Sequence, residues 1–129
     1  MGVKRVVPKK IKIHKSGESD GESSTTSDSW QEKLSISITL DVSTKFLLVW
    51  DFEMKNSTTK EVSVRVEQND TTEVAYTCED GVANEYMQRS GDRLITLASG
   101  TNTFDIDFKR PSTGTAYIRR ANLYLLKVY

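Results

Sequence analysis

Histidine and cysteine are almost absent from this chain of 129 residues, which contains one of each. His14 lies in a basic N-terminal segment, and Cys78 is far from it in the sequence. A nucleophilic triad needs a base beside its nucleophile, and a zinc site needs His and Cys ligands at set spacings. A single cysteine also excludes an intramolecular disulfide. We therefore predict a protein that is not an enzyme, that uses no cofactor or metal, and that is stabilised by packing alone.

Long apolar runs are absent as well. No stretch approaches the roughly 18 apolar residues of a membrane-spanning helix. The basic start of the chain is not followed by the apolar core of a secretory signal, so we expect neither a membrane protein nor a secreted one. Glycine-rich phosphate loops and dinucleotide-binding fingerprints are missing too.

What the chain does contain is an uneven distribution of charge. Residues 1–15 carry six Lys or Arg and no acid, whereas residues 16–129 carry twelve bases against eighteen acids, a net charge near −6. The basic arm and the acidic remainder therefore attract opposite partners. The alternation of Lys and Ile over residues 10–13 also allows a strand that adds to the edge of another sheet.

The arm has three possible interpretations. It can be a solvated tail, a segment that docks on an acidic or edge-strand protein surface, or a nucleic-acid contact. No aromatic residue is interleaved with the bases, and an acidic body repels nucleic acid, so we expect a protein partner. The predicted partner-binding residues are Lys4, Arg5, Lys9, Lys10, Ile11, Lys12, Ile13 and Lys15.

The remainder of the chain divides into two predicted parts. Residues 16–29 contain Gly, Ser, Thr and acids but no aliphatic or aromatic side chain, the composition of a disordered tether. Residues 30–129 have the size of one domain with its own core. The predicted organisation is therefore an arm at 1–15, a tether at 16–29 and a body at 30–129.

Apolar residues alternate with polar ones through most of the body, as in half-buried strands. The clearest strands are predicted near residues 34–40, 46–54, 62–66, 74–78, 94–98, 104–108 and 115–129. A hairpin-like turn is expected at 99–102, and a phase slip near Arg119 and Arg120 predicts a β-bulge. No segment has a sustained helical period. We predict an all-β fold, a single antiparallel β-sandwich of about eight strands with jelly-roll topology and an extended N-terminal arm.

Candidate chemical groups in the body have simpler structural interpretations. Asp105 and Asp107 alternate with Phe104, Ile106 and Phe108, so we expect both to be solvent-facing. Asp70, Glu79 and Asp80 lack the regular spacing of a calcium loop. Cys78 lies in a strand pattern and is expected to be a small buried hydrophobe.

Aromatic residues are the other binding candidates. Trp30 either closes one end of the body or contacts a partner, and Trp50 belongs to the core. If two or three tyrosines converged on an exposed face, they would form a platform for sugars or a hot spot for a protein partner.

The last third of the chain resembles a known class of protein. The segments at residues 97–104 and 114–125 resemble the closing strands of small jelly-roll decoration (cement) and auxiliary virion proteins of tailed bacteriophages. A related pattern occurs in carbohydrate-binding modules. The virion resemblance implies a non-enzymatic capsid decoration protein, assembled in the host cytoplasm, whose arm anchors a homo-oligomeric body on the protein lattice, with a trimer favoured. The alternatives are another phage part (tail, connector or fibre) and a carbohydrate-binding module.

Overall fold

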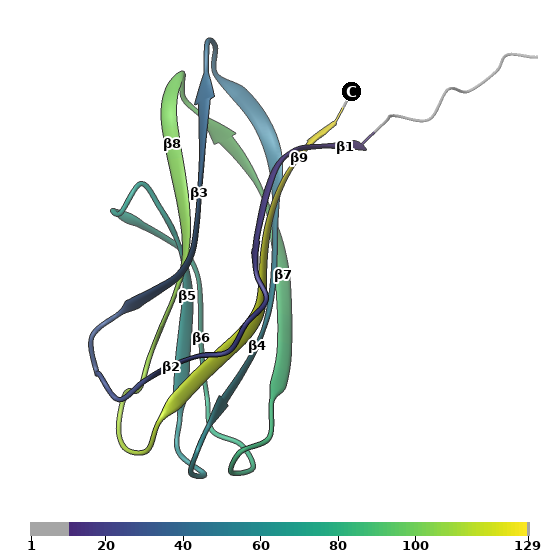
Figure 1. Ribbon diagram of the computed structural model, residues 1–129. Coiled ribbons are helices and arrows are strands. Elements are labelled where there is room, and N and C mark those ends of the chain that lie inside the picture. The colour runs from purple at the N-terminus through teal and green to yellow at the C-terminus, as the bar shows by residue number, and fades with distance from the viewer. Residues whose placement is uncertain (1–10, 129) are drawn as a thin grey trace, which may run out of the picture.

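The computed structural model describes residues 11–128, and these form nine strands (Figure 1). The strands are β1 (Ile11–Ser19), β2 (Ser23–Thr25), β3 (Gln31–Leu40), β4 (Thr44–Asn56), β5 (Val62–Gln68), β6 (Thr72–Glu79), β7 (Met87–Leu97), β8 (Gly100–Lys109) and β9 (Ala116–Val128). The predicted all-β class is confirmed, with nine strands in place of about eight. Over this range no helix is long and apolar enough to cross a membrane.

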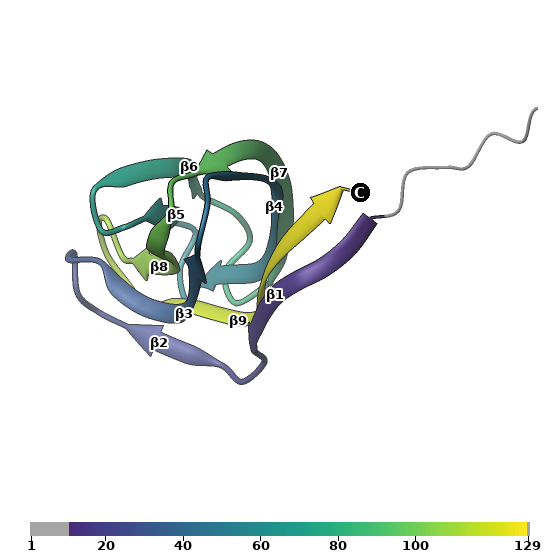
Figure 2. The same ribbon diagram turned by 90° about the horizontal axis from the view of Figure 1, so that it is seen from above.

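The strands form two antiparallel sheets, which Figure 2 shows from above as the layers of a sandwich. One sheet has the order β1-β9-β4-β7, with the short β2 also paired to β9, and the other has the order β3-β8-β5-β6. Most connections between successive strands pass from one sheet to the other. The predicted hairpin at 99–102 is therefore wrong, because β7 and β8 belong to opposite sheets and the turn between them crosses the sandwich.

The core lies between the sheets and follows the alternation in the sequence. On β4 the buried side chains are those of every second residue, including Trp50, and on β8 the apolar side chains that face the core are those of Phe104, Ile106 and Phe108. Trp50 packs against Gly91 of β7, where an added Cβ would lie 2.5 Å from the indole. The sandwich predicted from period-two alternation is therefore the fold, and Trp50 is confirmed as a core residue.

The predicted bulge near Arg119 and Arg120 is present in β9. Arg120 has a positive φ of 49°, and the pairing of β9 with β4 shifts register between Asp51 and Glu53. The bulge directs both arginines toward one carboxylate, with Arg119 Nη2 and Arg120 Nη1 at 2.9 and 3.0 Å from Glu53. The extra residue also allows the Arg120 N–H to donate to the carbonyl of Asp20 at 3.0 Å, so the bulge receives the N-terminal segment.

Residues 16–29 belong to the sandwich and do not form the expected tether. β1 continues to Ser19, and β2 pairs with residues 116–118 of β9. The physical reason is that β9 supplies main-chain partners, which composition does not reveal. Polar side chains hold the rest of the segment: Tyr86 donates to Glu22, and Lys33 donates to Ser23 at 2.9 Å.

Cys78 is exposed, so its expected burial is wrong. The pairing of β5 with β6 shifts register between Val66 and Glu67, which moves the core-facing phase of β6 from Val74 to Ala75 and Thr77. Cys78 then lies on the outer side of an edge strand. A bulge in one strand thus reverses the burial expected for every residue beyond it.

Gly17 and Gly21 provide a test of how the N-terminal segment packs. A Cβ on Gly17 would lie 2.4 Å from Cγ2 of Ile36, whereas a Cβ on Gly21 would meet nothing within 4 Å. We expect Gly17→Ala to lower the free energy of unfolding by about 1–3 kcal/mol through overpacking. Gly21→Ala should change it by less than about 0.5 kcal/mol. Urea unfolding measures both, and equal effects would indicate that residues 16–29 do not pack on the body.

Candidate functional site

The predicted anchor residues divide into two groups. Lys4, Arg5, Lys9 and Lys10 lie outside the described residues. Ile11, Lys12, Ile13 and Lys15 lie on β1, which pairs with the C-terminal end of β9. The period-two segment therefore does add to the edge of a sheet, but that sheet is its own.

Within the described residues 11–128, β1 pairs with β9 alone and is the terminal strand of its sheet. Lys12, Ile13 and Lys15 are all exposed, and Ile13 retains 59% of its accessible surface. His14 lies at a register shift in β1, with its ring 5.3 Å from that of buried Phe46. We call the exposed side of residues 12–15 the β1 edge. It combines an open strand edge, positive charge and an exposed aliphatic side chain.

Trp30 lies over the outer face of the four-stranded sheet. Its ring contacts Tyr76 edge-on, with a centroid distance of 6.0 Å. The Arg65 guanidinium carbon and the Lys109 Nζ lie 4.6 and 4.5 Å from the Trp30 ring centre. We call these four side chains the Trp30 cluster. Trp30 is half-buried and is not part of the buried core between the sheets.

Strand register explains why these four side chains meet. Ser63 of β5 lies opposite both Lys109 of β8 and Cys78 of β6, and the next outward pair on β5 and β6 is Arg65 with Tyr76. Trp30 immediately precedes β3, the edge strand on the other side of β8. Its side chain therefore reaches the cations of the two central strands. Cations over an indole face typically stabilise such a cluster by about 0.5–1 kcal/mol each at exposed sites.

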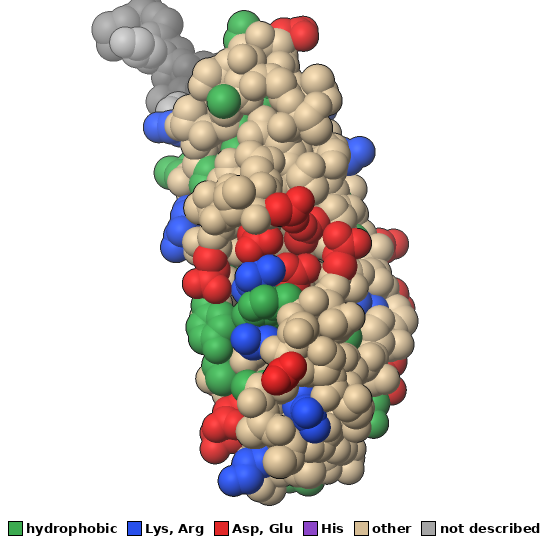
Figure 3. Space-filling model, turned by 90° about the vertical axis from the view of Figure 1, so that its left-hand side faces the viewer, with side chains coloured by type: hydrophobic (Ala, Val, Ile, Leu, Met, Phe, Trp, Pro, Cys, Tyr) green, Lys and Arg blue, Asp and Glu red, His purple; other side chains and the backbone are tan. Residues whose placement is uncertain are grey.

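Carboxylates occupy the neighbouring part of the same face, where Figure 3 shows a concentration of acidic side chains next to cationic and hydrophobic ones. Asp105 and Asp107 point away from the core, yet they are only 5% and 6% exposed. The expectation that both are solvent-facing is therefore wrong. β8 has β3 on one side and β5 on the other, and side chains from both neighbours cover its outward residues.

The two buried aspartates have opposite electrostatic surroundings. Asp107 accepts a hydrogen bond at 3.0 Å from Nε of Arg65, whose Nη1 also lies 3.1 Å from Glu67. Asp105 has no cationic partner of this kind, and its Oδ1 is buried without a hydrogen bond. Burial, together with the nearby carboxyl groups of Asp70, Asp107 and Glu32, raises the pKa of Asp105 to about 6, against a hydrogen bond from Ser35 that lowers it.

A second aromatic group lies at the other sheet and fastens the N-terminal segment. Lys55 Nζ lies 4.5 Å from the Tyr86 ring centre and 4.8 Å from that of Tyr117. Glu22 accepts a hydrogen bond from Tyr86 and lies 3.9 Å from Lys55. Burial, together with the Glu22 carboxylate, raises the pKa of the Tyr86 hydroxyl well above its ordinary value. These residues therefore hold the segment before β2 and leave no ring fully open.

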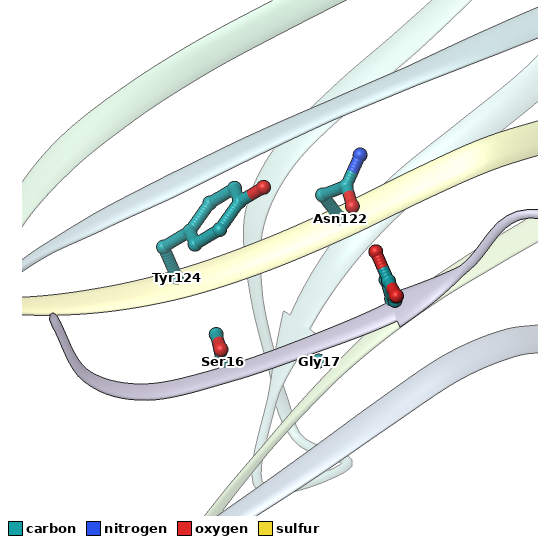
Figure 4. A pocket seen from close by; sticks show the side chains of 5 residues that line it. Ser16, Gly17, Asn122 and Tyr124 are labelled. Carbon is teal, nitrogen blue, oxygen red and sulfur yellow. The ribbon is translucent and has the colours of Figure 1, made fainter.

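A shallow pocket of about 310 Å³ lies between β1 and β9 (Figure 4). It is lined by Ser16, Gly17, Glu18, Asn122 and Tyr124. The hollow forms where the short side chain of Ser16 faces Tyr124 across the strand pair. Asn122 already donates to Asp51 at 2.6 Å. The lining is the polar surface of two paired strands.

Sequence reasoning identified Trp30 as a possible contact but missed the residues around it. Tyr76, Arg65 and Lys109 come from three strands that only the sheet order brings together. The sequence did contain one sign of them: on β5 and β8, charged residues alternate with apolar ones, so the charged side chains of each strand share its outer face. Alternation shows which side chains of one strand lie on the same face. It does not show which strands are neighbours, and this decides which side chains are in contact.

No family model matches this chain, and no curated protein matches it. Solved structures do share its fold. Dimeric latent PorU from Porphyromonas gingivalis aligns with a TM-score of 0.57 and 10% identity, over 98% of this chain and 13% of that one. A chain of infectious bursal disease virus, Gx strain, aligns at 0.51 and 11% identity, over 88% of this chain and 32% of that one. This chain therefore spans much less than two thirds of either. At such identities the likeness shows the β-sandwich fold alone.

The buried carboxyl of Asp105 predicts a pH-dependent stability. Its pKa in the folded protein is raised from 3.8 to about 6, so the folded state binds its proton more tightly than the unfolded state does. Ionising the buried carboxyl therefore lowers the free energy of unfolding. This loss is absent well below pH 4 and nearly complete above pH 6. Four other acids lie near the same carboxyl: Glu32, Glu67, Asp70 and Asp107.

We expect Asp105→Asn, measured in a chelating buffer, to raise the free energy of unfolding by up to about 3 kcal/mol at pH 8. The gain at pH 4 should be below about 1 kcal/mol, because most of the penalty has gone there. Urea unfolding at the two pH values measures the difference. Asp92→Asn, an exposed acid on β7, serves as the control and should show no such difference. A gain for Asp105→Asn that is equal at both pH values would contradict a buried, raised carboxyl.

Proposed function

We propose that this protein is a non-enzymatic structural protein of a virion, most specifically a capsid decoration protein that attaches through its basic N-terminal arm and the β1 edge. The observation that carries the proposal is the β1 edge itself. It follows directly on the basic residues 1–10, it lies at the end of a sheet, and it exposes Lys12, Ile13 and Lys15. The partner is a protein lattice, with major capsid protein or neighbouring subunits as the candidates.

The physical basis is strand addition reinforced by charge. An unpaired edge offers main-chain donors and acceptors to a strand of another protein, and side chains beside it provide selectivity. The bases of residues 1–15 would favour an acidic partner surface. Attachment of many copies to a repeating lattice makes a weak individual contact effective. One of the two structural neighbours reported above is a chain of a virus particle, which is compatible with this use of the fold.

A homo-oligomer, with a trimer favoured, completes the proposal. A trimer would have about three times the 14.6 kDa mass of one chain. The Trp30 cluster supplies a surface suited to a protein contact, because Trp, Tyr and Arg are enriched among residues that contribute most to binding. Other phage parts (tail, connector or fibre) use the same physical attachment and remain the alternatives within this class.

Virion association is tested first with the full chain. We expect an antibody against the protein to detect it in virus particles that have been purified on a density gradient from the same source. Added purified protein should also co-sediment with particles that lack it. Absence from every particle fraction, together with no co-sedimentation, would overturn the virion proposal.

The anchor is tested by charge reversal. We expect the double variant Lys12→Glu, Lys15→Glu to co-sediment with those particles at least about tenfold less well at physiological salt, because it replaces attraction with repulsion. The matched control is Lys60→Glu, Arg93→Glu, which reverses two exposed charges away from β1. Circular dichroism checks that both variants are folded. Equal binding by the two double variants would remove the β1 edge from the proposal while leaving virion association intact.

A carbohydrate-binding module is the second candidate, favoured by the meeting of Trp30 and Tyr76 on one outer face. Tyr76 is 51% exposed and offers one accessible ring, but Arg65 and Lys109 lie against the ring of Trp30. A stacked sugar needs an open aromatic face. We therefore expect a glycan array to show no strong binding. Robust binding to one sugar that is lost in Tyr76→Ala would favour this candidate over a structural protein.

A further inference from the structure

Three carboxylates from separate parts of the chain converge on the outer face of the four-stranded sheet. Glu67 belongs to β5, Asp70 to the turn between β5 and β6, and Asp105 to β8. One carboxylate oxygen from each residue lies within 4.8 Å of those of the other two. Oxygens this close together can surround one cation, and small side-chain rotations would bring each to the roughly 2.3–2.6 Å typical of Ca²⁺.

Asp105 provides an independent sign that this cluster suits a positively charged ligand. Its side chain belongs to a residue that is only 5% exposed, and its Oδ1 is fully enclosed without a hydrogen-bond donor. A buried acceptor without a partner is unfavourable, and a buried carboxylate beside other acids is more so. Asp107, two residues along the same strand, is buried with a cationic partner, since it accepts a hydrogen bond from Nε of Arg65 at 3.0 Å.

We propose that Glu67, Asp70 and Asp105 bind a divalent cation, and that Ca²⁺ binds there in preference to Mg²⁺. The donors are oxygens only, which excludes the soft metals that prefer Cys and His. Ca²⁺ accepts six to eight oxygens in irregular geometry, whereas Mg²⁺ demands a compact octahedron. Three carboxylates that lie up to 4.8 Å apart suit the larger ion. Water molecules complete the coordination.

The surrounding structure holds Asp70 in place for this role. Asn69 and Asp70 have φ values of 53° and 56°, as in the tight turns that join twisted antiparallel strands. Asn69 is fastened to β8, since its N–H donates to the Thr103 carbonyl at 2.8 Å and its Oδ1 accepts from the Thr103 N–H at 2.8 Å. The turn is therefore tied to the strand that carries Asp105, which limits the motion needed to close around an ion.

Bound Ca²⁺ would join β5, β8 and the β5–β6 turn at one point and would neutralise charge that the protein otherwise leaves uncompensated. Arg65 is the one cation in ion-pair contact with this group among the residues described, and it serves Asp107 as well as Glu67. Because Arg65 also contacts Trp30, an ion at Glu67 would reach the Trp30 cluster through a single side chain. This inference does not depend on virion attachment.

Calorimetry and thermal unfolding test the site on the full chain after removal of metal by a chelator. We expect CaCl₂ at millimolar concentration to raise Tm by about 5 °C or more, and MgCl₂ to raise it by less than half as much. Asp105→Asn should bind Ca²⁺ at least about tenfold more weakly, because it removes a charged ligand. Asp92→Asn, an exposed acid on the other sheet, should bind as the wild type does.

Asp70→Asn is the second variant, chosen because Asn tolerates a positive φ and should preserve the turn. It should also lose at least about tenfold in affinity for Ca²⁺ while keeping the Tm of the metal-free wild type within a few degrees. The proposal is overturned if Ca²⁺ produces neither binding heat nor a rise in Tm with the wild type. It is equally overturned if both Asp105→Asn and Asp70→Asn respond to Ca²⁺ as fully as Asp92→Asn does.

Discussion

The antiparallel pairing of β9 is the interaction on which the five-stranded sheet depends. Along its length β9 pairs with β4 on one side and with β1 and β2 on the other. The bulge at Arg120 lets β9 pair on both sides. It shifts the register of β9 with β4, and it directs the Arg120 N–H toward the Asp20 carbonyl. Ordering a polar segment costs about 1–2 kcal/mol of backbone entropy for each residue. β9 offsets this cost with main-chain hydrogen bonds, and Gly17 adds close packing on Ile36.

The second constraint is electrostatic and concerns the opposite sheet. A central strand such as β8 has its outward side chains covered by both neighbours, so any charge placed there is partly desolvated. Asp107 is compensated by Arg65, and Asp105 is not. An uncompensated buried carboxylate reduces stability, and the cation site that we propose would offset that cost. The neighbouring acids make a cation the simplest counterpart, since added negative charge cannot satisfy Asp105.

Sequence reasoning predicted the class of fold because it rests on local alternation, which is strong in β3, β4, β5 and β8. It failed where a residue's surroundings depend on distant strands. Cys78 changed face because of a bulge in β6 at Val74, opposite Val66 and Glu67, and residues 16–29 became ordered because β9 pairs with parts of them. The carboxylates of Glu67, Asp70 and Asp105 follow no local spacing rule, since two of them lie near one turn and the third lies on another strand. The Trp30 cluster was missed for the same reason. The anchor role of Lys12, Ile13 and Lys15, inferred from charge and alternation, stays a prediction.

The β1 edge and the outer face of the four-stranded sheet differ in the chemical groups that they expose. The β1 edge offers main-chain groups and positive charge at one end of the five-stranded sheet, so the partner that we propose for it is an acidic strand or surface. The outer face of the other sheet presents Trp30 and Tyr76 beside a group of acids. Arg65 connects the two halves of that face, because it contacts the Trp30 ring, Asp107 and Glu67 together. A cation that took over Glu67 would leave Arg65 held by Asp107 and the indole. The position of Trp30 would then depend on the charge state of residues on β5 and β8, and contacts made by this face would respond to the cation while those of the β1 edge would not.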